Sequence, residues 1–194
     1  MDLRERPNTL ARLLSIVGHP AVVMPVAALI ASSAHANTQL ILQAFGLFAL
    51  CALLVMSYSV FKTKRGDWEH VDASNKNERA ELNRIVTIAL LLLAIGLYFD
   101  GANKAVIIAL GLSAGIVMAG HLLRGIAKPS LHVAFGVFAA LITWPNMIAA
   151  IVMLALASAV AWSRLKLERH TKLDVYIGAL LGIAAGIIYH VSLR

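Results

Sequence analysis

The chain has 194 residues, of which 60% are hydrophobic and only 14% are charged, and its mean hydropathy is +0.80. So much apolar surface excludes an ordinary soluble domain, and the composition predicts one polytopic membrane domain over residues 1–194. The formal net charge is +7, and Cys51 is the single cysteine, which excludes an intrachain disulfide and a cysteine-based metal site.

Seven apolar segments follow one another along the chain, each bounded by charged residues, Pro, Asn or Gly. They cover residues 13–33, 40–61, 85–99, 105–123, 131–143, 146–162 and 175–193. This pattern predicts an all-α bundle of six to seven transmembrane helices. Several segments, notably residues 131–143, are shorter than the roughly 20 residues of a straight span, so we expect the bundle interior to shelter them.

The first segment has to be distinguished from a signal peptide, because Arg4, Arg6 and Arg12 precede it and residues 34–36 read Ala-His-Ala. Its uncharged run over residues 13–33 has 21 residues. The apolar region of a signal peptide is shorter, about 7 to 15 residues. We therefore expect an uncleaved helix here.

The basic residues are distributed unevenly between the two ends of the predicted bundle. Fifteen of the 17 Lys and Arg lie in the N-terminal tail and in loops 62–84, 124–130 and 163–174, and the other two are Lys104 and Arg194. Alternating spans place the tail and these loops at one end. Short cytoplasmic loops collect Lys and Arg, so this end is expected to face the cytoplasm of a bacterial or archaeal cell membrane. The charge predicts anionic lipid head groups as partners and requires no nucleic acid.

The loop before the last segment contains "SRLKLERHTKLD", residues 163–174. Ser163 and Arg164 are followed by His170 and then by Asp174, and the last two would share one face if the stretch were helical. A carboxylate in that position would hold one imidazole nitrogen and leave the other free to attack. A solvated basic loop explains the same stretch equally well.

The loop before the fifth segment contains "KPSLH", residues 128–132. Pro129 and Ser130 are typical helix-start residues, so backbone N–H groups are expected to point at an anion, with His132 on the first turn as a proton donor. An ordinary N-cap beside an interfacial histidine is the alternative. Three further histidines, His19, His121 and His190, lie in apolar segments, and we interpret them as hydrogen-bonded to backbone.

Together, these two stretches resemble two signatures of the type 2 phosphatidic acid phosphatase superfamily, SRxxxxxHxxxD and PSGH. The first signature matches at all four fixed positions, and the second differs only at Leu131, which stands in place of Gly. The third signature of that family, KxxxxxxRP, corresponds best to "DASNKNERA", residues 72–80. Here Arg79 matches, whereas Asp72 and Ala80 replace Lys and Pro, and Lys76 is the candidate for the missing cation.

The resemblance implies a membrane lipid phosphatase that hydrolyses a phosphomonoester or diphosphate of a lipid, such as phosphatidate, phosphatidylglycerophosphate or a polyprenyl diphosphate. It implies that His170 is the nucleophile, that Asp174 supports it and that His132 is the proton donor, with neither metal nor cofactor. The groups implied to hold the phosphoryl oxygens are Arg79, Ser130, the Leu131 N–H, Arg164 and Lys76. A lipid phosphotransferase and a non-catalytic lipid-binding or lipid-translocating relative stay open as alternatives.

Two apolar segments separate each motif stretch from the next, so all three stretches are expected at the same end of the bundle. An odd number of spans between any two of them would exclude a shared site.

Overall fold

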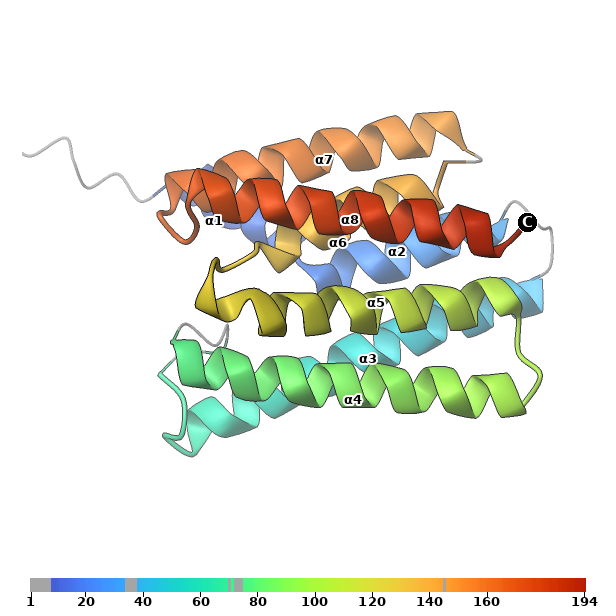
Figure 1. Cartoon of the computed structure of the whole chain (residues 1–194), viewed down its shortest axis with the longest axis horizontal. Coiled ribbons are helices and arrows are strands. Elements are labelled where there is room, and N and C mark those ends of the chain that lie inside the picture. Colours follow the sequence, from blue (N-terminus) through green and yellow to red (C-terminus); the bar gives the residue numbers. More distant parts are fainter. Residues whose placement is uncertain (1–7, 34–37, 70, 72–74, 145) are drawn as a thin grey trace, which may run out of the picture.

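The computed structural model describes residues 8–33, 38–69, 71, 75–144 and 146–194, and this part of the chain contains helices and no strand. The α-helices are α1 (Thr9–Val17), α2 (Pro20–Ser33), α3 (Thr38–Lys64), α4 (Lys76–Phe99), α5 (Lys104–Leu122), α6 (Leu131–Ile142), α7 (Met147–Lys166) and α8 (Lys172–Ser192), and a 3-10 turn, η2 (Leu123–Gly125), follows α5. The expected all-α bundle is confirmed (Figure 1).

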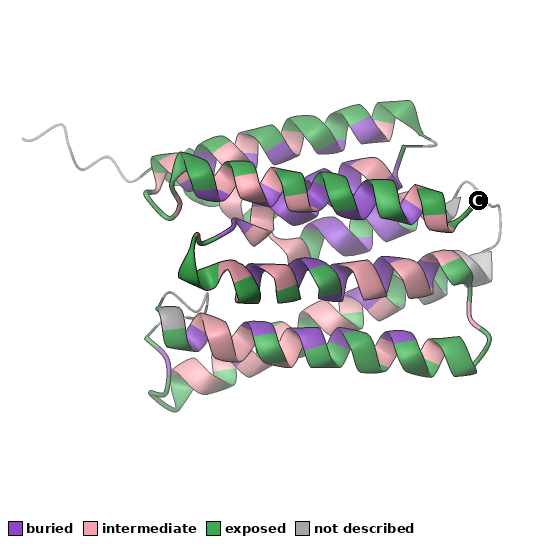
Figure 2. Ribbon diagram, viewed as in Figure 1, coloured by how far each residue is buried: buried purple, intermediate pink, exposed green. Residues whose placement is uncertain are grey.

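Five of the described helices, α3, α4, α5, α7 and α8, are long and apolar enough to cross a membrane. Counting the bent pair α1 and α2 as one span gives six, the lower of the two numbers expected. Large apolar side chains cover the outer faces of these helices, since Leu53, Leu92 and Ile148 are 64%, 64% and 78% exposed. Figure 2 shows how much of α3, α4, α7 and α8 is exposed in this way. Soluble proteins rarely expose so much contiguous apolar surface, and the chain is an integral membrane protein.

The first apolar segment is not the single helix that we expected. It divides into α1 and α2, which meet at an angle of 48°. Pro20 has no N–H to donate and disfavours helical geometry at His19, so the first helix stops before this pair. Gly18 lies at this break and packs directly against α7. A side chain at this position would not fit, because its Cβ would collide with Val160. His19 then caps α2, since its ring Nδ1 accepts the Ala21 N–H at 3.1 Å.

Helix α6 is short and lies inside the bundle. Its 12 residues extend about 18 Å, well below the roughly 30 Å of a hydrocarbon core. Nine of the 12 are buried, and α2, α7 and α8 pack around the helix. α8 can approach α6 closely because Gly178 has no Cβ. A Cβ at this position would lie only 2.6 Å from the Ser130 carbonyl oxygen. The expectation that the bundle interior shelters residues 131–143 is confirmed.

The connections between helices divide into two groups, one at each end of the bundle (Figure 1). The connections α3–α4, α5–α6 and α7–α8, which carry the three motif stretches, lie at one end. The connections α4–α5 and α6–α7 and the C-terminus lie at the other. The even number of apolar segments between successive motif stretches therefore does bring these stretches to a common end.

Candidate active site

The carboxylate of Asp174 ties the start of α8 to the loop before α6. Thr171 and Asp174 form a capping box, in which the Asp174 N–H donates to Thr171 Oγ1 (3.2 Å) and the Thr171 N–H donates to Asp174 Oδ2 (2.9 Å). Asp174 Oδ1 accepts the Lys128 N–H at 2.7 Å, and the Ser130 N–H donates to the Asp174 carbonyl at 3.0 Å. Because Asp174 is only 5% exposed, these bonds are shielded from water. The stretches 128–132 and 163–174 form one hydrogen-bonded unit.

His170 lies in the loop before α8 and is oriented mainly by a backbone carbonyl. Its Nδ1 is 3.0 Å from the Lys128 carbonyl oxygen and 3.8 Å from Asp174 Oδ2. A carbonyl oxygen can only accept, so the ring proton is on Nδ1 and Nε2 keeps its lone pair. Asp174 Oδ2 is within ion-pair distance of the imidazole but makes no hydrogen bond to it. Asp174 binds the Lys128 N–H, and the carbonyl of the same residue holds His170.

The surroundings of His170 keep its imidazole neutral. Its side chain is 4% exposed, and burial together with the positive charges of Arg164 and Arg79 lowers its pKa to about 4. Burial and the charge of Arg79 also lower the pKa of Lys128. Near pH 7 His170 is therefore neutral, which is the nucleophilic form of the ring, and the neighbouring cations help to keep it so.

Ser163 and Arg164 end α7 and are bound to α1. The Ser163 hydroxyl donates to the Ala11 carbonyl oxygen at 2.6 Å, and Arg164 Nη1 donates to Ser15 Oγ at 2.7 Å. Arg164 is 7% exposed, so its position is determined by these neighbours. Ala11 and Ser15 belong to no motif and lie far from α7 along the chain. The sequence therefore gave no indication of this contact.

Ser130 is buried at the start of α6 without serving as a conventional cap. It is 0% exposed, its hydroxyl makes no capping hydrogen bond, and that hydroxyl has no partner among the described residues. Buried hydroxyl groups are normally hydrogen-bonded, so this one keeps an unused donor directly beside Pro129 and Leu131, which line the cavity. The Ser130 N–H is occupied by Asp174, which leaves the first-turn N–H groups from Leu131 onwards to face an anion.

His132 on the first turn of α6 packs against His19, with ring centroids 4.9 Å apart and planes at 87°. The charges of Arg164 and Arg79, which act on His170, also act on His132, so His132 belongs to the same group. His19 and His190 do make the backbone hydrogen bonds expected of them, at 3.1 Å to Ala21 and 2.8 Å to Leu141. Sequence reasoning nevertheless missed that His19 reaches the site.

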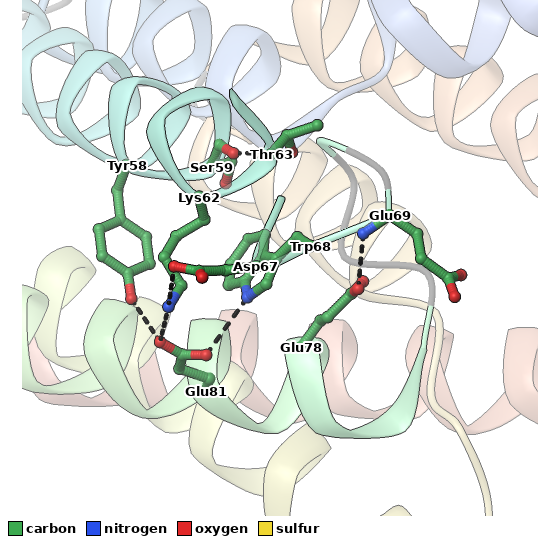
Figure 3. Close-up of polar contacts among 9 residues, drawn as sticks. All are labelled: Tyr58, Ser59, Lys62, Thr63, Asp67, Trp68, Glu69, Glu78 and Glu81. Carbon is green, nitrogen blue, oxygen red and sulfur yellow. Dashed lines mark hydrogen bonds and ion pairs between the residues drawn. The ribbon is translucent and has the colours of Figure 1, made fainter. Parts of the chain in front are cut away.

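The connection between α3 and α4 is held by two glutamates of α4 (Figure 3). Glu81 accepts from the Tyr58 hydroxyl at 2.6 Å and from Trp68 Nε1 at 3.2 Å, and it pairs with Lys62 at 3.2 Å. Glu78 accepts the Glu69 N–H at 2.8 Å and completes a capping box with Asn75. Figure 3 shows both carboxylates directed at this connection.

Arg79 lies between these glutamates in the sequence and lines the cavity that the other motif residues share. Its charge acts on Lys128, His132 and His170, so the structure brings Arg79 to the site even though Asp72 and Ala80 depart from the family signature. The side chain of Lys76 and the whole of Asp72 lie outside the described residues. The expected part of Lys76 stays a prediction.

The site opens into a cavity of about 1270 Å³. Its polar lining includes the motif residues Arg79, Lys128, His132, Arg164 and His170, and the carboxylates of Asp67, Glu78 and Glu81 line it near the connection between α3 and α4. Apolar side chains from α2, α3, α5 and α6 line the rest, among them Met24, Phe48, Val117 and Phe135. A cavity with a cationic head and an apolar wall matches a molecule that has a phosphate head and a hydrocarbon tail.

Comparison with family models, with curated proteins and with solved structures finds no match for this chain.

Proposed function

We propose that the protein is a membrane lipid phosphatase that removes a phosphate group from a lipid phosphomonoester or diphosphate through a phosphohistidine. The observation that carries the proposal is the state of His170, whose Nδ1 is hydrogen-bonded to a carbonyl and whose Nε2 keeps its lone pair. Arg79 and Arg164 supply positive charge beside this nucleophile. The motif resemblance and the apolar wall of the cavity support the same conclusion.

In the proposed reaction His170 Nε2 attacks phosphorus in line, and the bond from phosphorus to the lipid oxygen breaks. For this step His132 must be in its protonated, imidazolium form, and it gives that proton to the departing oxygen and becomes neutral. His132 then takes a proton from water as that water attacks the phosphohistidine, which releases inorganic phosphate and restores the neutral His170. Asp174, whose Oδ2 is 3.8 Å from Nδ1, stabilises the positive charge that the imidazole develops in between.

The phosphoryl oxygens are held by the guanidinium groups of Arg79 and Arg164, the unpartnered hydroxyl of Ser130 and the Leu131 N–H. Arg79 and Arg164 line the cavity without a substrate, so little reorganisation of these two cations is needed as charge builds up on the oxygens. Lys76 is proposed as an additional cation that binds the phosphoryl group. A phosphotransferase would use the same groups and differ only in the acceptor that replaces water.

The decisive experiment measures phosphate release from phosphatidate, phosphatidylglycerophosphate and a polyprenyl diphosphate by the purified full chain. We expect release from at least one lipid, no dependence on added metal, and inhibition by vanadate. His170→Ala should retain less than about 1% of the activity, because the nucleophile is lost. Lys166→Ala, an exposed change at the end of α7, is the matched control. Wild-type protein that releases no phosphate from any of these lipids would refute the proposal.

We also propose that the motif-bearing end faces the cytoplasm and that the enzyme acts on the inner leaflet. The excess of Lys and Arg at this end supports the orientation. The test uses single cysteines introduced at Lys64, Lys166 or Asn103 after replacement of Cys51. In intact cells a membrane-impermeant maleimide should label only the cysteine at position 103. Labelling at positions 64 and 166 would show the reverse orientation.

A further inference from the structure

Besides His19, three basic side chains line the cavity without belonging to any motif stretch. They are Arg84 on α4, His121 near the end of α5, and Arg124 in the turn η2. The proposed mechanism uses none of them. The charges of Arg124 and Arg84 both act on His121, so the three form one group.

The hydrogen bond between His121 and Arg124 determines which ring nitrogen of His121 carries the proton. Arg124 Nη1 is 3.1 Å from His121 Nε2. A guanidinium can only donate, so Nε2 accepts and the proton of the neutral ring is on Nδ1. That Nδ1 is shielded from solvent and has no hydrogen-bond partner among the described residues. We expected a hydrogen bond from His121 to backbone, but its ring nitrogens make none to the described backbone. The ring instead presents a buried N–H donor that lacks an acceptor.

Arg84 is directed towards the same end of the bundle. Its Nε donates to the Ala80 carbonyl at 3.3 Å, one turn closer to the start of α4, so the side chain runs back towards the motif-bearing connections. A long cationic side chain near a helix end commonly bends in this way to bring its head group to the membrane surface. The guanidinium thus contributes positive charge to the wall of the cavity near His121.

This group lies beside the proposed phosphoryl site. Gly120 precedes His121, and a Cβ at Gly120 would be 3.0 Å from the Leu131 side chain on the first turn of α6. The same turn carries His132 and follows Ser130. The two sets of cations therefore line a single cavity and are linked where α5 meets the first turn of α6, and each contains donors suited to an oxyanion.

We infer that Arg84, His121 and Arg124 form a second phosphate subsite, and that the substrate is a lipid with a second phosphate adjacent to the one that is hydrolysed. This inference rests on the proposed function, because it places the terminal phosphate at His170. The second phosphate accepts from His121 Nδ1 and from the two guanidinium groups. Its negative charge offsets the positive charge of the subsite.

The test compares farnesyl diphosphate with farnesyl monophosphate, which share a tail and differ by one phosphate. Arg84→Gln and Arg124→Gln should each lower kcat/KM for the diphosphate by about 10-fold or more, as expected for a lost charge-assisted hydrogen bond, and should change the monophosphate by less than about 3-fold. Arg65→Gln is the matched control, because Arg65 stacks on Phe61 and does not line the cavity. Equal losses for both lipids, or none for either, would overturn the inference.

His121 permits a finer comparison. His121→Leu removes the donor, whereas His121→Asn keeps an N–H near the position of Nδ1. We expect the leucine variant to lose the preference for the diphosphate and the asparagine variant to retain most of it. Equal preferences in the two variants would contradict a donor function for Nδ1.

Binding separates this inference from the proposed reaction. The variant His170→Ala should bind farnesyl diphosphate more tightly than farnesyl monophosphate, and Arg124→Gln in that background should remove the difference. We expect inorganic phosphate to bind at the phosphoryl site, where it should displace farnesyl diphosphate and farnesyl monophosphate alike. If wild type releases no phosphate from any lipid, the proposed reaction fails, and this binding difference still decides on the subsite. Equal binding of the two lipids would refute the subsite while leaving the reaction intact.

Discussion

Two regions of the site hold their functional residues by different means. Around His170, the Asp174 carboxylate, the Lys128 backbone and the Thr171 cap form a buried unit in which nearly every bond involves backbone. Around Arg79, the side chains of Tyr58, Lys62 and Trp68 hold the connection between α3 and α4 through Glu81. The first region matches the family signatures closely, and the second departs from them.

The contrast indicates where such a site tolerates change. A nucleophile needs one orientation and one tautomer, so the residues that determine them are restricted. A cation acts through its charge over several ångströms, and different local structures can deliver it. Arg79 therefore reaches the site from the first turn of α4, beside a connection held by carboxylates of the same helix, without the Lys and Pro that the resembling family signature has.

The largest effect should come from breaking the backbone unit. Asp174→Ala removes the acceptor of the partly buried N–H groups of Lys128 and Thr171, at a cost of about 1 kcal/mol each in the free energy of unfolding. It also frees the loop that orients His170, so activity should fall by at least about 1000-fold. Asp174→Asn restores one acceptor and should lie between wild type and alanine in both measurements. Thermal unfolding and phosphate release, measured on the same samples, check this order.

The second region should respond less strongly. Arg79→Ala removes one pre-positioned donor to the phosphoryl oxygens and should lower kcat by about 100-fold. If Lys76 supplies the missing cation of the family signature, Lys76→Ala should cost about 10-fold on the same substrate. An unchanged rate in Lys76→Ala would show that Arg79 alone represents this signature.

His19 tests whether contacts outside the motifs affect the chemistry. Its ring packs against His132, the proposed proton donor, so His19→Asn keeps an α2 cap but loses the ring contact. We expect kcat for an alkyl phosphate to fall by about 10-fold, because its leaving oxygen needs a proton. An aryl phosphate with an acidic leaving group should be nearly unaffected. Equal losses on both substrates would assign His19 a purely structural function.

A smaller effect is expected when the side-chain network of the second region is weakened. Glu81→Gln loses the ion pair with Lys62 but keeps an acceptor for Tyr58 or Trp68. Activity should decrease only a few-fold, through the position of Arg79, since exposed ion pairs contribute little. The double variant Glu81→Gln, Arg79→Ala should be no worse than Arg79→Ala alone. Additive losses would show that Glu81 acts independently of Arg79.

The smallest expected change links the two regions through pH. His170 must be neutral to attack, and its pKa is lowered to about 4, so kcat/KM should fall only as the pH drops through about 4. Between the ordinary value of about 6.5 and about 4, the unfolded chain binds the proton that folded His170 rejects, so stability should also fall with decreasing pH. Arg79→Gln removes a nearby positive charge and should move the acid limb to higher pH. An unmoved limb would show that Arg164 and burial alone determine it.

Much of the helical framework is readable from apolar length. The expected segment 146–162 corresponds to α7 (Met147–Lys166), and the segment 175–193 corresponds to α8 (Lys172–Ser192). The break at Gly18 to Pro20 was missed even though Pro20 is visible, because an uninterrupted apolar run outweighed a single proline in the prediction. The motif residues were found because their spacing is local, while Ala11, Ser15 and His19 were not.

The sequence by itself determined that the chain is an all-α membrane protein and that the three motif stretches meet at one end, because hydrocarbon thickness sets the helix length and the number of spans sets the side. Only the tertiary structure decided the proton positions on His170 and His121, the anchoring of Ser163 to α1, and the unpartnered hydroxyl of Ser130. Each depends on a contact, or the lack of one, between groups that only folding places side by side. Apolar periodicity reports which face of a helix is buried, but not which carbonyl or hydroxyl it will meet there.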